Sequence, residues 1–128
     1  MIIYNPMKKN REYDQNIINA LKALPSPLKT FDEHNVFFDI DKRDETIFEH
    51  ISNKKHHFHV VDINAIPLVL KNKECLKTDR SGKRFRTYIG ERGKTKEKPK
   101  YLKIVTLLGK NNKESVYSVY LVKSVDKK

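Results

Sequence analysis

Three strand-like segments in the second half of the chain constrain its fold more than any other feature. They are Lys83–Ile89, Tyr101–Leu108 and Val116–Lys123, and each alternates polar with apolar side chains or is rich in β-branched and aromatic residues. The last two are joined by Gly109–Asn112, a connection typical of a β-hairpin. Gly90–Pro99 separates the first two and reads as a charged loop. The sequence therefore predicts an antiparallel meander. In its last strand, simple alternation sets Tyr117, Val119 and Leu121 against Val116, Ser118, Tyr120 and Val122.

Helical patterns come before these strands. Asn16–Leu24 has apolar residues at helical spacing and is stopped by Pro25-Ser26-Pro27. A second short helix is predicted at Ile47–Ile51, and a third is expected to be capped by Asp62. Asn35–Ile40 reads as a short strand. This order predicts the α+β class, with N-terminal helices packed on one face of a three- to four-stranded antiparallel sheet.

The length of 128 residues fits one compact domain. We expect residues 1–45 to form an N-terminal arm with the first helix and strand, and residues 46–128 to form the α+β core. The longest apolar runs are about five residues, far short of a membrane span of about 20. No secretory signal is visible at the N-terminus, and the single Cys75 cannot form an internal disulfide. We therefore expect a cytoplasmic protein that does not contact membranes.

The charge is strongly asymmetric. The whole chain carries a formal net charge of +11, but residues 1–64 contain 9 basic and 10 acidic side chains, whereas residues 65–128 contain 18 and 6. Such a basic half favours a nucleic-acid partner, because each phosphate that a cation neutralises releases counterions. Two alternatives are a lysine-rich surface that serves solubility alone and a surface that binds an acidic protein or the surface of a membrane. The cations expected to contact nucleic acid are Lys83, Arg84, Arg92, Lys94, Lys96, Lys98, Lys100 and Lys103.

Candidate acid–base residues cluster just before the third helix. His56, His57 and His59 lie within four residues, and histidine titrates near neutrality. No second histidine or cysteine pair completes a metal site, and with only four glycines no phosphate-binding loop is present, so no metal or cofactor is expected. RNA can be cleaved without metal, since its 2′-hydroxyl attacks the neighbouring phosphate when a base, an acid and cations are supplied. Arg84 and Arg86 could supply the cations, and they share one predicted strand face with Tyr88, although packing explains such residues equally well.

The segment from Ile47 to Lys123 resembles the phage-encoded branch of the barnase–EndoU–colicin–RelE ribonuclease fold. The similar features are a short helix followed by histidines (His56-His57-Phe58-His59), a helix ending in Leu70-Lys71-Asn72, and a basic strand (Arg84-Phe85-Arg86-Thr87-Tyr88). The apolar strand Tyr101–Val105 and the terminal strand Val116–Val122 complete the similarity. This resemblance implies a small α+β domain with a four-stranded antiparallel sheet and metal-independent RNA cleavage.

The resemblance also implies roles for individual residues. His59 or His57, with His50 behind them, would act as general acid or base, and Arg86 would stabilise the phosphate. Tyr88 would be the polar aromatic of the family, and Ser118 its polar residue on the last strand.

Three functions remain open at this point. The first is a metal-independent endoribonuclease that acts on RNA rather than DNA. The second is a non-catalytic protein of a phage or mobile element that binds a nucleic acid or ribonucleoprotein and inhibits a host defence nuclease. The third is an interaction protein whose charge only keeps it soluble. An inhibitor or a host effector protein is a further expected partner.

Overall fold

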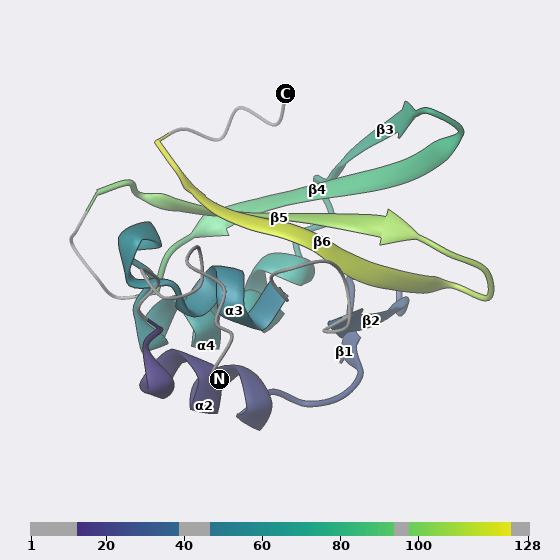
Figure 1. Cartoon of the computed structure of the whole chain (residues 1–128). Coiled ribbons are helices and arrows are strands. Elements are labelled where there is room, and N and C mark those ends of the chain that lie inside the picture. The colour runs from purple at the N-terminus through teal and green to yellow at the C-terminus, as the bar shows by residue number, and fades with distance from the viewer. Residues whose placement is uncertain (1–12, 39–46, 94–97, 124–128) are drawn as a thin grey trace, which may run out of the picture.

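The computed structural model describes residues 13–38, 47–93 and 98–123, and it has the predicted α+β class (Figure 1). In chain order the elements are α2 (Gln15–Ala23), β1 (Leu28–Lys29), β2 (Asn35–Phe38), α3 (Ile47–Ser52), a 3₁₀ turn (Lys54–His56), α4 (Val60–Leu70), β3 (Leu76–Arg80), β4 (Lys83–Glu91), β5 (Tyr101–Leu108) and β6 (Lys113–Val122). The predicted first helix and the three predicted strands of the meander are therefore present.

The sheet is larger than predicted and is mixed rather than antiparallel. It has six strands in the order β1-β2-β6-β5-β4-β3. The meander β4–β5–β6 is antiparallel, as expected, but β2 pairs with β6 in parallel. Two strands, β1 and β3, were not predicted from the sequence. Strand β1 has only two residues, and β3 (Leu76–Arg80) is too polar to show the alternation of polar and apolar residues typical of a strand.

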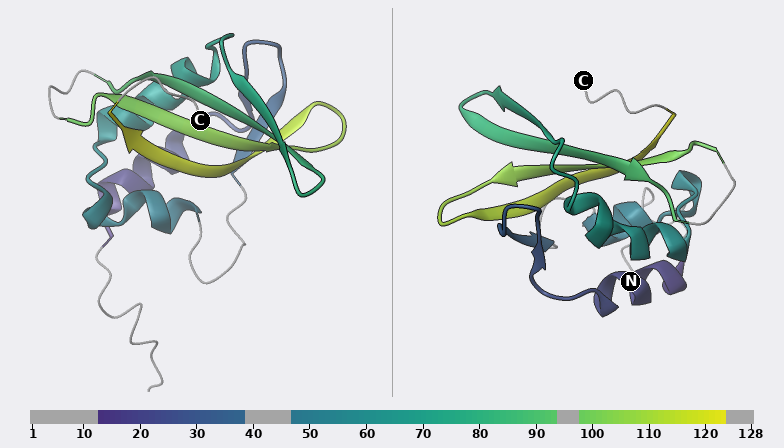
Figure 2. Two further views of the ribbon diagram at one scale, coloured as in Figure 1. Left: turned by 90° about the horizontal axis from the view of Figure 1, so that it is seen from above. Right: turned by 180° about the vertical axis from the view of Figure 1, so that it is seen from behind.

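All the described helices lie on one side of the sheet (Figure 1). Helix α4 contacts β4 and β5, α3 contacts β6, and α2 packs chiefly on α3 and α4. The opposite side of the sheet has no described helix in front of it (Figure 2). The hairpins β3–β4 and β5–β6 extend past the helices on the right of Figure 1, near β1 and β2.

One hydrophobic core joins the two parts of the chain. Ile17 and Leu21 of α2, Leu28 of β1 and Val36 of β2 are buried in the same cluster as the core residues of the later elements. Those later residues include Ile51, Phe58, Ile63, Ile66, Val69, Leu70, Tyr88, Leu102, Ile104, Val116 and Val119. The described residues before position 45 therefore belong to the same core as the rest of the molecule.

Strand β6 contains a β-bulge that changes which side chains face the core. Val105 pairs with Ser118 and Thr106 pairs with Val116, so Tyr117 is an extra residue in β6. Val116 and Val119 are consequently both buried on the helix side, whereas Tyr117 and Tyr120 are exposed on the other. The simple alternation expected from the sequence is wrong at this point, because it places Val116 and Val119 on opposite faces.

Local sequence explains where the helices begin and end. The carboxylate of Asp14 accepts a hydrogen bond of 2.9 Å from the backbone N–H of Asn16 and caps α2, which ends before Pro25. Helix α4 begins at Val60, earlier than expected, so Asp62 lies inside its first turn.

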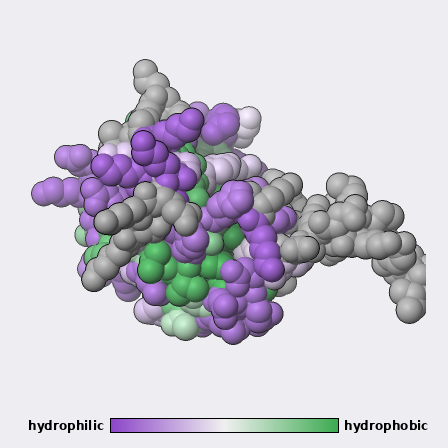
Figure 3. Space-filling view, turned by 90° about the vertical axis from the view of Figure 1, so that its left-hand side faces the viewer, coloured by the Kyte–Doolittle hydropathy of each residue, from purple (hydrophilic) through white to green (hydrophobic). Residues whose placement is uncertain are grey.

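No helix in the described part of the chain combines the length and apolarity required to cross a bilayer. Viewed from the left of Figure 1, the surface has a hydrophobic area bordered by hydrophilic residues (Figure 3).

Candidate functional site

A buried network of charged and polar side chains connects β4, β5 and β6 on the helix side of the sheet. Glu114 of β6 is completely buried, and its carboxylate accepts hydrogen bonds from Tyr88 (2.7 Å), Thr106 (2.6 Å) and Arg86 (2.7 Å). The Arg86 guanidinium is 3% exposed and also donates to the Tyr88 hydroxyl at 3.0 Å. Strand pairing explains the proximity, since Arg86 lies opposite Thr106 and Leu108 opposite Glu114. A buried carboxylate of this kind is stable only with such partners.

The turn between β1 and β2 completes the network from the other side. Arg86 binds Asp32 through both terminal nitrogens, at 3.0 Å and 2.5 Å. His34 Nδ1 lies 2.7 Å from Glu114 Oε2, and its Nε2 lies 3.6 Å from Asp32 Oδ2. Thr30 is buried and donates to Asp32, while its hydroxyl accepts from the backbone N–H of His34. The turn is thus fixed against the sheet by residues more than 50 positions away in the sequence.

These contacts fix the charge states of three groups. The hydrogen bond from Arg86 holds the pKa of Asp32 far below its usual range. The same hydrogen bond raises the pKa of Arg86, so both groups stay ionised. Burial, followed by the hydrogen bond to Glu114, raises the pKa of Tyr88 well above its usual value, so its hydroxyl stays protonated.

Asp32, His34 and Glu114 also form a possible metal-ligand set, since their ligand atoms lie within 4.8 Å of one another. The Arg86 guanidinium, however, donates to both carboxylates and therefore already supplies the positive charge there. A metal ion would have to displace it. The chemistry of the donors favours a built-in ion pair over a metal centre.

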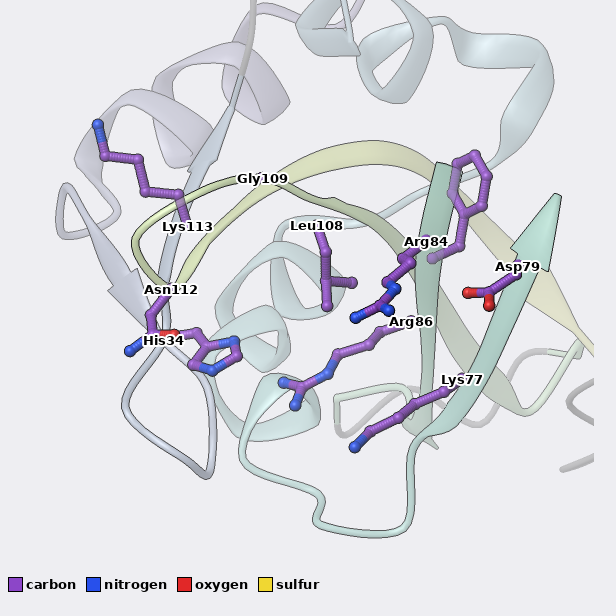
Figure 4. A pocket seen from close by; sticks show the side chains of 10 residues that line it. His34, Lys77, Asp79, Arg84, Arg86, Leu108, Gly109, Asn112 and Lys113 are labelled. Carbon is purple, nitrogen blue, oxygen red and sulfur yellow. The ribbon is translucent and has the colours of Figure 1, made fainter. Parts of the chain in front are cut away.

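An open hollow of about 650 Å³ lies next to this network, and we call it the basic trough (Figure 4). Its lining comes from β3, β4, the β5–β6 hairpin and the turn before β2: His34, Lys77, Asp79, Arg84, Phe85, Arg86, Leu108, Gly109, Asn112 and Lys113. Arg84, Arg86 and Lys77 extend in the same direction, toward the side where His34 lies (Figure 4). Register accounts for this, because Lys77 pairs with Arg86 and Asp79 with Arg84 on adjacent strands.

The trough carries an excess of positive charge toward solvent. Arg86 pairs with two carboxylates, Asp32 and Glu114, whereas Lys77, Arg84 and Lys113 face only that of Asp79, so the cations exceed the carboxylates by one. Arg84, Lys77 and Lys113 are exposed, and the side chains of Arg84 and Lys77 make no hydrogen bond or ion pair with another described residue. The Arg86 Nε is buried and without a hydrogen-bond partner among the described residues. Such a surface attracts phosphate groups.

His57 and His59 lie elsewhere, beside a second buried ion pair. Arg92 binds Asp62 through two hydrogen bonds of 2.9 Å and 2.8 Å, and the two side chains are 2% and 0% exposed. Arg92 also donates to the backbone carbonyls of Pro99 and His57, and Asp62 accepts from the backbone N–H of His59. Arg92 was predicted to contact nucleic acid, but its guanidinium is buried and its hydrogen bonds hold neighbouring loops to α4.

The histidines before α4 line a hollow of their own. His50, His56 and His57 surround a space of about 550 Å³ together with Phe58, Lys98, Pro99, Val119, Tyr120 and Leu121. The rings of His50 and His56 are tilted against each other with centroids 4.3 Å apart. This hollow shares no lining residue with the basic trough. The structure therefore separates the predicted histidines from the predicted Arg86.

The remaining predicted residues are distributed over the surface. Ser118 pairs with Val105, which pairs with Thr87. Ser118 therefore shares the face of Thr87, which is opposite to that of Tyr88. Lys103 lies on that same face, with its Nζ 6.0 Å from the centre of the Tyr120 ring. Lys83, Lys98 and Lys100 are exposed, and Lys94 and Lys96 lie outside the described residues. The five residues predicted to be catalytic are thus not brought together.

No known protein family, curated protein or solved structure matches this chain significantly. The site must therefore be interpreted from its own chemistry. Of the predicted residues, the structure brings together Arg84, Arg86 and Tyr88. The sequence did not indicate Asp32, His34, Lys77, Lys113 or Glu114 as site residues. Only Glu114 had a signal, because it is an acidic residue in the otherwise apolar inward row of β6.

Proposed function

We propose that this chain is a nucleic-acid-binding protein whose phosphate contacts are made in the basic trough. The observation that carries the proposal is the alignment of Arg84 and Lys77 beside the buried Arg86 in an open hollow. The net charge of +11 adds long-range attraction. A protein of this kind could also inhibit a ribonucleoprotein nuclease by covering its RNA or its DNA channel.

Rigidity supports this proposal. Hydrogen bonds to Asp32, Glu114 and Tyr88 hold the Arg86 side chain in place. They therefore also fix β4, which carries Arg84, and the paired strand β3, which carries Lys77. Cations held on paired strands lose less conformational freedom on binding than cations on a free tail. The buried network thus positions the strands, and the exposed cations on those strands make the phosphate contacts.

The test is a binding titration with labelled RNA and DNA at several salt concentrations. We expect Arg84→Gln and Lys77→Gln to weaken binding several-fold and each to lower the slope of log affinity against log salt by about 1. Lys22→Gln is the matched control, because it removes one charge from an exposed position on α2 that does not line the trough. Equal affinities for the trough variants and the control would refute the proposal.

A second function, metal-independent RNA cleavage, is supported by one specific arrangement. His34 lies against Glu114 and beside Arg86, so a titratable imidazole, a carboxylate and a cation meet at the edge of the trough. The resemblance to the barnase–EndoU–colicin–RelE fold points to the same reaction. In this version His34, rather than His57 or His59, transfers the proton.

Cleavage of RNA in the presence of EDTA distinguishes the two functions. If the chain is a ribonuclease of this kind, His34→Ala abolishes cleavage, whereas His57→Ala retains it. If the wild-type protein binds RNA without cleaving it, the second function is rejected and the binding function stands. Loss of cleavage in His57→Ala alone would reject the role of His34.

A further inference from the structure

The helix-free face of the sheet carries an apolar row on β4 that is 3% to 7% exposed, and beside it an accessible aromatic area on β6. Strand pairing places its members in adjacent rows: Phe85, Thr87 and Ile89 of β4; Lys103, Val105 and Leu107 of β5; and Tyr117, Ser118 and Tyr120 of β6. No described helix covers these rows (Figure 2). A sheet face that met only water would be expected to carry mostly polar side chains. The part of this face that is left accessible lies around Tyr117 and Tyr120.

Two aromatic rings dominate the accessible part of the face. Tyr117 is 47% exposed and Tyr120 is 45% exposed, which is high for residues in the middle of a strand. Tyr117 is supported from one side by Phe85, with ring centroids 5.2 Å apart in an edge-to-face arrangement. Three residues of extended strand separate the two tyrosines by about 10 Å, so the rings are distinct platforms.

Cations accompany the rings. The Arg80 guanidinium lies 5.6 Å from the centre of the Phe85 ring, and Lys103 Nζ lies 6.0 Å from that of Tyr120. On β4, Lys83 shares the row of Phe85, and Glu91 is the one acid in this row, at its far end. Aromatic platforms flanked by positive charge are complementary to unpaired bases joined by phosphates.

We propose that single-stranded nucleic acid binds across this face, with bases stacked on Tyr117 and Tyr120 and phosphates near Lys103 and Arg80. The inference rests on the proposed nucleic-acid function and narrows its substrate class to single strands at this surface. Bases in a duplex are stacked on one another and cannot reach a flat sheet, whereas a single strand can turn each base onto a ring.

The test compares a labelled single-stranded oligonucleotide with a duplex of the same sequence. We expect the double variant Tyr117→Leu/Tyr120→Leu to bind the single strand at least about tenfold more weakly, since loss of a stacking ring removes a large part of the affinity per base. Its affinity for the duplex should not change. The matched control, Tyr117→Phe/Tyr120→Phe, keeps both rings and should retain single-strand binding.

Three outcomes would overturn the inference, and they differ in what else they affect. If the leucine variant binds the single strand as well as wild type does, this face is not the site, while the trough proposal stands. If wild type self-associates in sedimentation and the leucine variant is monomeric, the face is a contact between copies of the chain. If wild type binds neither probe, the proposed function itself fails. Thermal unfolding of each variant confirms that it is folded.

Discussion

At the scale of the residue, the most informative pair is Arg86 and Tyr88. The alternation of their strand correctly predicted that both lie on one face, but their polarity gave no indication that both side chains are buried. Burial is possible because Asp32 and Glu114 supply the partners, and both lie far away in the sequence. No local pattern connects such residues. The roles of Asp32 and His34 therefore could not be predicted from the sequence.

Tyr88 provides a prediction about stability at alkaline pH. Its pKa is raised in the folded protein, whereas in the unfolded chain it ionises near the ordinary value of 10.0. The folded state therefore retains a proton that the unfolded state releases, and the free energy of unfolding should fall as the pH rises above about 10. In Tyr88→Phe this part of the pH dependence disappears, although the variant is less stable at neutral pH. Urea titrations between pH 8 and 11 measure both effects. An unchanged alkaline slope in the variant would contradict the assignment.

At the scale of the element, turns were predicted better than strand partners. Gly109–Asn112 was recognised as a hairpin connection, and Asn111 and Asn112 adopt the left-handed conformations, with φ of 60° and 57°, that this turn needs. The hairpin β3–β4 was missed although Ser81-Gly82 connects it, because β3 has no apolar pattern. The parallel pairing of β2 with β6 was missed as well, since sequence order says nothing about which distant strands meet.

Ser81 tests the turn of the β3–β4 hairpin. Its φ is 54°, a left-handed conformation that costs a serine more than an asparagine. We expect Ser81→Asn to raise the free energy of unfolding by up to about 1 kcal/mol, measured by urea denaturation. Gly82→Ala is the opposite control: φ is +76° and no atom lies within 4 Å of an added Cβ, so any destabilisation comes from the backbone alone. A Ser81→Asn protein less stable than wild type would contradict this account.

At the scale of the whole molecule, the class was predicted and the architecture only in part. Helices followed by strands correctly indicated an α+β fold, but the sheet has six strands because β1 and β2 are added to one edge and β3 to the other. The placement of charge in the second half of the chain was informative, since Lys77, Arg84 and Lys113 of the trough all come from it. What the composition could not reveal is that Arg92, in the same basic region, is buried.

Truncation tests the unity of the core. A chain that lacks residues 1–45 loses Ile17, Leu21, Leu28 and Val36, all of which are buried against later elements, and it loses the Asp32 partner of Arg86. We expect this chain to lose cooperative thermal unfolding, because a large share of its buried apolar surface becomes exposed. The control lacks only residues 1–12. A sharp, wild-type-like unfolding transition in the shorter chain would show that residues 46–128 fold alone.

The β-bulge at Tyr117 has a consequence for how this chain can tolerate insertions and deletions. One end of β6 must turn Glu114 inward to meet Arg86, and the other end must turn Val119 inward to meet the helices. Regular alternation that turns Glu114 inward would turn Val119 outward. The extra residue Tyr117 shifts the alternation by one, so that both face inward. Deleting that single residue would remove the bulge and leave a regularly alternating strand in which Glu114, Val116 and Val119 still face inward. The bulge is therefore the place in β6 where the loss of one residue disturbs the orientation of the neighbouring side chains least.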